Sequence, residues 1–280
     1  MTRVGVDLRI VHFARTGFHR FGRGLVQALE RFPEPDAQYV LLVSEGAEPL
    51  SASPHLRHVY VQTPLFVPDE GDRLARELAP LALDVAHFPF SLFPGRVAPR
   101  VTLTVHDTTC LAWPETVEAR YRQHYRSAID RADTADVVIT VSRATAEALR
   151  EAGVRSPVRV VYQDTPFEQS CGLTGEADVA FFRHLLDAPY LLSVGSLEPR
   201  KNQAFLVETC TGLWDEGLDF TLHLVGRVNP HFGRKILKRI MALQKRYPGL
   251  QFHEAADDEL LRWIYGQVDR KSTRLNSSHT

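Results

Sequence analysis

The sequence has few cysteines, no strong excess of charge of either sign and no long hydrophobic run. The three cysteines, Cys110, Cys171 and Cys210, are too few and too scattered for a disulfide framework or a metal-binding knuckle. We therefore interpret them as small buried hydrophobic residues. Lys and Arg number 33 and Asp and Glu number 34, a net charge of −1, which argues against nucleic-acid binding.

No apolar run approaches the roughly 18 residues of a membrane span, and the first residues lead directly into a strand pattern. We find no signal peptide and no membrane span in this pattern. These absences lead us to expect a soluble protein of a reducing compartment, the cytoplasm.

The apolar residues occur in short runs that alternate with amphipathic stretches, which is typical of parallel βα units. Runs such as VVITV and YLLSV are apolar at nearly every position, as expected of strands covered on both faces by helices. The predicted strands are 3–10, 39–44, 58–61, 84–88, 101–105, 136–141, 158–162, 190–194, 220–225 and 250–252. The predicted helices are 20–32, 73–81, 117–133, 143–152, 179–186, 203–216, 232–247 and 258–267.

A length of 280 residues predicts about two domains at roughly 150 residues each. Seven predicted strands fall in the first half and only three in the second, so we expect an N-terminal domain over 1–165 and a partial second domain over 189–269. Residues 166–188, which continue a polar stretch without periodicity, form the predicted linker. The last residues, 270–280, also lack periodicity, and we set them aside as an artefact-like or disordered tail.

The segment YLLSVGSLEPRKN, residues 190–202, combines a buried strand with two cations at the start of a helix. Arg200 and Lys201 beside free backbone N–H groups would form an anion site suited to a diphosphate. Asn202 is the predicted cap of the helix that follows. The alternative interpretation is an ordinary solvated loop with surface charges.

A second candidate lies in TLTVHDTT, residues 102–109, at the end of another apolar strand. His106 there can hydrogen-bond a sugar hydroxyl or a phosphate, with Asp107 orienting the ring. The alternative is a His-Asp pair that satisfies nearby backbone groups. Ser142 is a predicted helix N-cap.

The first loop, TGFHRFGRG at residues 16–24, lacks the G-x-G-x-x-G spacing of dinucleotide-binding proteins. This absence argues against a nicotinamide-dependent oxidoreductase.

Taken together, VGSLEPRKN, ADVVITVSRATAEAL, TVHDTT and TGFHRF resemble the family-four glycosyltransferases of the GT-B fold, over residues 3–268. The resemblance implies an α/β protein of two doubly wound Rossmann-like domains, the second incomplete here. It also implies transfer of a hexose, with retention, from a nucleotide-diphosphate sugar to a saccharide or lipid-linked acceptor in polysaccharide or lipopolysaccharide biosynthesis.

Carried over by position, the resemblance assigns roles to four residues. Lys201 with Arg200 would bind the donor diphosphate and stabilise the departing charge. His106 would contact the donor sugar near its reacting carbon, and Gly17 would line the phosphate side of the site. No metal and no other cofactor is expected, because fixed cations meet the developing negative charge.

Three departures from the family pattern accompany this resemblance. His19 stands in a first loop where many members carry smaller residues, and Gln163-Asp164 stands where relatives often read Asn-Gly. The acidic E-x7-E block expected after residues 258–267 is not in this sequence. We therefore expect the chain to be poorly active or inactive. The alternative hypothesis is a non-catalytic GT-B-like binding or scaffold protein.

The predicted helix over 232–247 is basic and amphipathic. It could lie on an anionic membrane near a lipid-linked acceptor, or pack its apolar face into the core with its cationic side in solvent. Its candidate apolar residues are Ile236, Leu237, Ile240, Met241 and Leu243.

Overall fold

The structure is a computed structural model that describes residues 1–12, 17–163, 189–254, 261 and 265. The chain divides into two compact units, with the described residues up to Gln163 in the first and those from Pro189 in the second. The predicted linker 166–188, the predicted tail 270–280, the predicted helix 179–186 and most of the predicted helix 258–267 lie outside the described residues.

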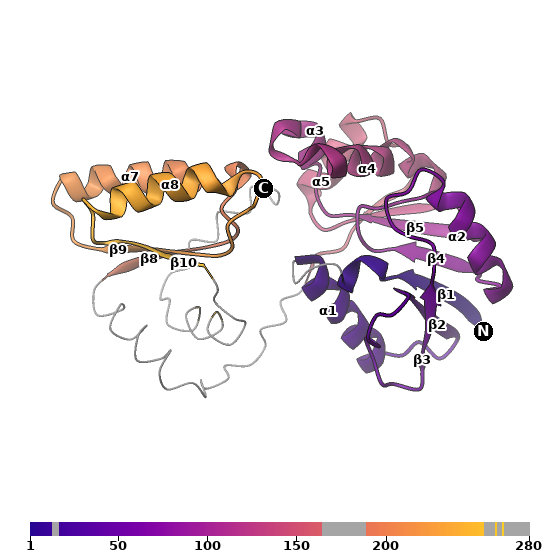
Figure 1. Ribbon diagram of the computed structural model, residues 1–280. Coiled ribbons are helices and arrows are strands. Elements are labelled where there is room, and N and C mark those ends of the chain that lie inside the picture. The colour runs from indigo at the N-terminus through magenta and orange to yellow at the C-terminus, as the bar shows by residue number, and fades with distance from the viewer. Residues whose placement is uncertain (13–16, 164–188, 255–260, 262–264, 266–280) are drawn as a thin grey trace. The chain divides into compact units, whose positions relative to one another are not determined.

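The first unit contains a parallel sheet of seven strands in the order β3-β2-β1-β4-β5-β6-β7 (Figure 1). Because the chain runs outward in both directions from β1, the strand order reverses between β1 and β4. The carboxyl edge at such a reversal is where open α/β sheets bind their ligands. The strands are β1 (Thr2–Asp7), β2 (Ala37–Ser44), β3 (Leu56–Val61), β4 (Val85–Phe88), β5 (Arg100–Val105), β6 (Val137–Thr140) and β7 (Val158–Val160).

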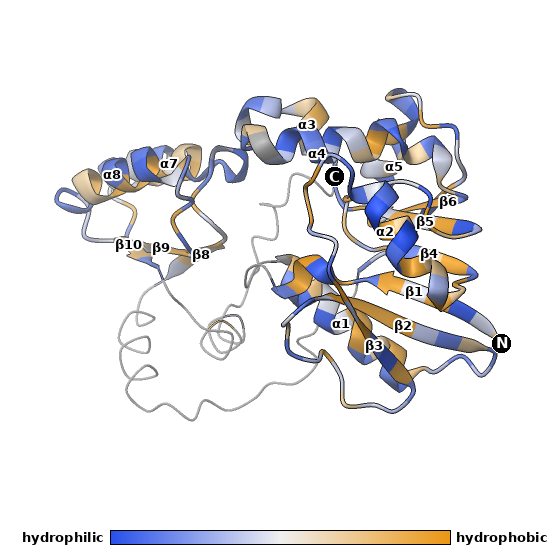
Figure 2. Cartoon of the chain, turned by 45° about the vertical axis from the view of Figure 1, so that its right-hand side comes forward, coloured by the Kyte–Doolittle hydropathy of each residue, from blue (hydrophilic) through white to orange (hydrophobic). Residues whose placement is uncertain are grey.

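Helices cover both faces of this sheet. On one face, Val26 of α1 packs with Leu41 and Val43 of β2, whereas Val40 and Leu42 of the same strand pack against the helices on the other face. The strand therefore buries successive residues on opposite faces, which explains its continuous apolar run (Figure 2). The helices of the unit are α1 (Gly17–Arg31), α2 (Glu70–Leu78), α3 (Thr109–Ala112), α4 (Ala119–Asp130) and α5 (Arg143–Glu151).

The second unit has three described parallel strands, β8 (Tyr190–Val194), β9 (Thr221–Val225) and β10 (Leu250–His253), in the order β10-β9-β8. Helices α7 (Gln203–Asp215) and α8 (Gly233–Gln244) lie together on one side of these strands (Figure 1).

Helix α8 packs its apolar side into the core of the second unit. Ile240 is buried there, with Ile236, Leu237 and Leu243 packed beside it, whereas Met241 is 59% exposed. The interpretation of a core-facing helix with a solvated cationic side is confirmed for these residues. The predicted apolar face was wrong only at Met241, which lies on the outer side.

All ten predicted strands are present, with boundaries that differ by a few residues. Strand β1 ends at Asp7 rather than at residue 10, because the chain enters a short 3-10 helix at Arg9–His12. The N-cap prediction for Ser142 is confirmed, since its hydroxyl accepts a hydrogen bond from the Thr145 N–H at 3.1 Å.

Two of the three cysteines lie in the described part of the chain. Cys110 and Cys210 are both free and buried, as interpreted from the sequence, and Cys171 lies outside the described residues. Among the described helices, none is long and apolar enough to cross a membrane.

Candidate active site

The loop that follows β8 is joined to the loop that follows β9. The Gly195 N–H donates to the Val225 carbonyl at 2.8 Å, and the Leu197 N–H donates to the Arg227 carbonyl at 2.9 Å. The loops also share a sequence pattern, VGSLEP at 194–199 and VGRVNP at 225–230, and this similarity is a sequence signal for their pairing. A Cβ atom on Gly226 would lie only 2.1 Å from the Gly195 carbonyl oxygen, so glycine is required for the two loops to approach this closely.

Lys201 lies over the end of β8. It is the last residue of a 3-10 helix, Pro199–Lys201, and its backbone N–H donates to the Glu198 carbonyl at 3.0 Å. A Cβ atom on Gly195 would be 3.9 Å from both Cδ and Cε of Lys201. The absence of a side chain at Gly195 thus leaves room for the lysine stem at the carboxyl edge of the strand, where α7 begins.

Arg200 leaves the same short helix but is ion-paired. Its Nη2 donates to Oε1 of Glu198 at 3.0 Å, and the Glu198 side chain is largely buried. Glu198 therefore already balances the charge of Arg200. Of the two cations predicted from the sequence, Lys201 is the one whose stem lies beside Gly195 at the end of β8.

Asn202 precedes α7 as predicted, but the capping prediction was wrong. Its backbone is left-handed (φ 54°, ψ 29°), and its side chain makes no capping hydrogen bond with the described part of the chain. The loop is held instead by Gln203, which is buried and donates from its side-chain amide to the Ser196 carbonyl at 2.8 Å. The only sequence signal for this role is a polar residue on the inward face of the helix.

His106 follows β5 at the carboxyl edge of the first unit's sheet. Its Nε2 lies 2.7 Å from the Pro89 carbonyl oxygen, which can only accept, so we assign the proton to Nε2. Nδ1 then accepts a hydrogen bond from the side-chain amide of Gln163 at 2.9 Å. The rings of Phe21 and Phe90 pack around the imidazole, with the Phe21 centroid 4.7 Å away.

Asp107 does not take the orienting role suggested by the sequence. Its Oδ1 accepts the Thr109 N–H at 2.9 Å, at the start of α3. Pro89 and Gln163 orient the His106 ring instead. The alternative interpretation, in which both side chains satisfy nearby groups of the chain, describes this part of the site better.

Strand β4 carries a second, half-buried histidine. Nδ1 of His87 lies 2.7 Å from the hydroxyl of Thr102 on the neighbouring strand β5. Burial lowers the pKa of His87 to about 4, and the nearby His106 acts in the same direction. His87 is therefore neutral at physiological pH.

Gly17 is the first residue of α1. A Cβ atom there would meet no described atom within 4 Å, so packing among the described residues does not require glycine at this position. His19, which stands where many family members carry smaller residues, is half-buried, and its Nδ1 lies 3.0 Å from the Val11 carbonyl oxygen. Residues 13–16, which precede α1, lie outside the described residues.

A model of the family described as Glycosyltransferase Family 4 matches residues 22–163, about half of the chain. This chain belongs to glycosyltransferase family 4. The matched region carries β2 to β7 and includes His106 and Gln163. A search of the curated proteins finds no match for this glycosyltransferase.

Solved structures resemble this glycosyltransferase along most of its length. Anabaena Alr3699/HepE in complex with UDP is 17% identical, with a TM-score of 0.62 over 93% of this chain and 71% of that one. The trehalose-6-phosphate synthase OtsA is 12% identical, with a TM-score of 0.65 over 95% and 76%. The α,α-trehalose-phosphate synthase (UDP-forming) of Burkholderia vietnamiensis is 12% identical, with a TM-score of 0.61 over 95% and 76%. The α/β fold of the GT-B class predicted from the sequence is confirmed.

Proposed function

We propose that this family-4 protein transfers a hexose, with retention, from a nucleotide-diphosphate sugar to a saccharide or lipid-linked acceptor. The observation that carries the donor assignment is the position of Lys201 over Gly195, where β8 ends and α7 begins. A cation beside the first N–H groups of a helix is suited to a diphosphate. Neighbours of the same fold were solved with such ligands, HepE with UDP-glucose and an E. coli protein with UDP-2-fluoro glucose.

In this proposal Lys201 binds the donor diphosphate and stabilises the charge that develops on it as the sugar departs. Arg200 contributes less, because Glu198 already pairs with its guanidinium. The fixed cation acts without a metal. The departing phosphate accepts the proton of the acceptor hydroxyl, so this scheme uses no pair of carboxylates.

His106 contributes through Nδ1. Its Nε2 proton is held by the Pro89 carbonyl within the same unit, whereas Nδ1 accepts from the exposed Gln163 side chain. We propose that a hydroxyl of the donor sugar takes the place of the Gln163 amide and donates to Nδ1. Gly17 lines the phosphate side of the site in the same proposal. The cellular context that we propose is polysaccharide or lipopolysaccharide assembly in the cytoplasm.

A thermal-shift screen of the whole chain tests the donor assignment. A ligand that binds only the folded state stabilises it by about 2.7 kcal/mol at a hundred times its Kd. We expect UDP-glucose, UDP-galactose, GDP-mannose or ADP-glucose to raise the Tm of the wild type and to have less effect on Lys201→Ala. Lys238→Ala, an exposed lysine on α8, is the matched control. A flat response to all four nucleotide sugars would contradict the proposal.

Release of nucleoside diphosphate in the same samples separates an enzyme from a scaffold. Nucleotide binding together with release of the diphosphate supports the transferase. Even slow release that depends on an acceptor sugar contradicts the non-catalytic alternative, because the chain is expected to be poorly active.

A further inference from the structure

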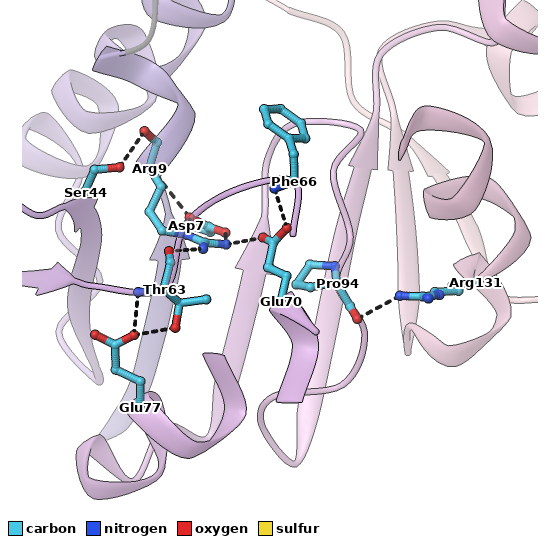
Figure 3. Close-up of polar contacts among 9 residues, drawn as sticks. All are labelled: Asp7, Arg9, Ser44, Thr63, Phe66, Glu70, Glu77, Pro94 and Arg131. Carbon is cyan, nitrogen blue, oxygen red and sulfur yellow. Dashed lines mark hydrogen bonds and ion pairs between the residues drawn. The ribbon is translucent and has the colours of Figure 1, made fainter. Parts of the chain in front are cut away.

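A buried ionic cluster occupies the carboxyl end of β1 (Figure 3). Arg9, 1% exposed, donates to both carboxylate oxygens of Asp7, at 2.9 Å from Nε and 2.7 Å from Nη2. Its Nη2 also donates to Oε1 of Glu70 at 2.8 Å, and its Nη1 donates to the Thr63 carbonyl at 3.0 Å. The guanidinium therefore joins β1, the loop after β3 and the start of α2.

The cluster fixes the backbone of the loop at residues 62–69. Glu70 accepts the Phe66 N–H at 2.9 Å with the carboxylate oxygen that Arg9 does not contact. Farther along α2, Glu77 accepts the Thr63 N–H and hydroxyl at 2.9 and 2.6 Å. Both glutamates of α2 thus hold this one loop.

The residue held in this way, Phe66, has a left-handed backbone with φ of 67°. Such a conformation is unfavourable for a bulky side chain and persists only where the surroundings impose it. Among the described residues only Ala82 and Asn202 share it outside glycine. Backbone strain of this kind clusters at functional sites, so the position of the Phe66 ring is a candidate functional feature.

The Phe66 ring points away from the ionic cluster, as Figure 3 shows. It is half-buried and lies outside the buried apolar clusters of the unit. Two rings of α4 lie beside it, with the centroids of Tyr121 and His124 at 5.6 and 4.8 Å. The three rings together present an aromatic surface that also carries a phenol hydroxyl and an imidazole.

This surface adjoins the carboxyl edge at which the strand order reverses. Leu65, the neighbour of Phe66, lines a small cavity together with Asp7 from β1 and Pro89 and Phe90 from the end of β4. Pro89 is the residue whose carbonyl holds His106. The loop therefore reaches from the reversal point toward the histidine of the candidate active site.

We propose that Phe66, Tyr121 and His124 form a stacking platform for the acceptor saccharide, a proposal that rests on the proposed function. The C–H face of a pyranose is apolar and can lie flat on an aromatic ring, while its hydroxyl groups bond to polar atoms at the rim. The ionic cluster of Asp7, Arg9 and Glu70 holds Phe66 in place for this contact. Tyr121 and His124 supply both ring surface and hydrogen-bonding groups.

Phe66→Gly separates this role from ordinary packing. Glycine adopts positive φ without strain, so we expect the Tm to be unchanged or higher. Sugar binding is followed by saturation-transfer NMR with methyl α-glucopyranoside, methyl α-mannopyranoside and N-acetylglucosamine. It should fall about tenfold, the lower end of the loss seen when an aromatic ring that stacks on a nucleic-acid base is removed. Phe66→Tyr should retain binding. Ala82→Gly, the matched left-handed position, should affect stability alone.

Tyr121→Ala provides a second test that leaves the strained loop intact, and it should also weaken sugar binding. Titration with UDP is the separate readout for the donor site and should be unchanged in Phe66→Gly. A wild type that binds UDP but none of the three sugars overturns the platform and leaves the proposed function standing. Equal sugar binding by wild type and Phe66→Gly, or loss of UDP binding in that variant, also overturns it.

Discussion

Replacing Arg9 with methionine tests how much the buried ionic cluster contributes to the first unit. Methionine preserves much of the side-chain length but removes the group that bonds Asp7, Glu70 and Thr63. Both carboxylates would then be buried without their cation. Breaking a buried ion pair by removing one partner typically costs about 3–5 kcal/mol, and we expect a loss in that range.

The loss should depend on pH. Burial raises the pKa of the Glu70 carboxyl in the wild type, and the charge of Arg9 opposes this effect. Without Arg9 the pKa of Glu70 should rise further. When the pKa of a carboxyl is higher in the folded state than in the unfolded state, ionisation of that carboxyl destabilises the folded state. Protonation at lower pH removes this destabilisation. The deficit of Arg9→Met should therefore shrink as the pH falls from about 8 toward about 5.

Urea denaturation followed by far-UV circular dichroism measures these differences. Arg73→Met is the matched control, because Arg73 of α2 pairs with Asp69, the residue before the helix, while both side chains are about half exposed. Solvent screens such a pair, so its loss should change the stability little. Adding Glu70→Gln to Arg9→Met should recover part of the loss. A cost below about 1 kcal/mol for Arg9→Met, or a cost independent of pH, would refute the reasoning.

Three further predictions concern the interior. Because the pKa of His87 is lowered to about 4 in the folded state, only the unfolded chain binds a proton at this residue between about pH 6.5 and 4. The stability that depends on neutral His87 is therefore complete above about pH 6.5 and is lost as the pH falls toward 4. His87→Asn should flatten the decline in Tm over that range. Gly226→Ala should force apart the loops after β8 and β9 and weaken UDP binding in calorimetry, whereas Gly212→Ala, with open space at its Cβ, should not. Burial raises the pKa of the Cys110 and Cys210 thiols to about 11, so both stay protonated and unreactive at neutral pH. In a variant that lacks Cys171, a thiol reagent at neutral pH should label neither of them until the chain unfolds.

Much of the fold was predictable because its strands are buried on both faces. Runs such as YLLSV and VVITV are apolar throughout, and β8 was predicted at its observed bounds, Tyr190–Val194. Boundaries were harder where polar side chains decide them. The bonds between Arg9 and Asp7 end β1 early, and periodicity contains no information about that contact.

The places of the candidate site residues in the fold were predictable from the sequence, and their hydrogen-bond partners were less so. His106 and Lys201 stand at the carboxyl ends of strands, as the sequence indicated. The partners came from distant positions, since Pro89 and Gln163 lie 17 and 57 residues from His106. The role of Phe66 was not predicted, because its left-handed backbone depends on Glu70, which is itself held by Arg9, a residue 61 positions away along the chain.

Calorimetric titration with UDP and GDP, each compared with its monophosphate, tests the central claim most directly. If Lys201 grips the diphosphate at the end of β8, the wild type should prefer one diphosphate over its monophosphate. Lys201→Ala should lose about 1.5–3 kcal/mol of that preference, the range for hydrogen bonds to charged groups. An unchanged preference for the diphosphate in Lys201→Ala would contradict the account.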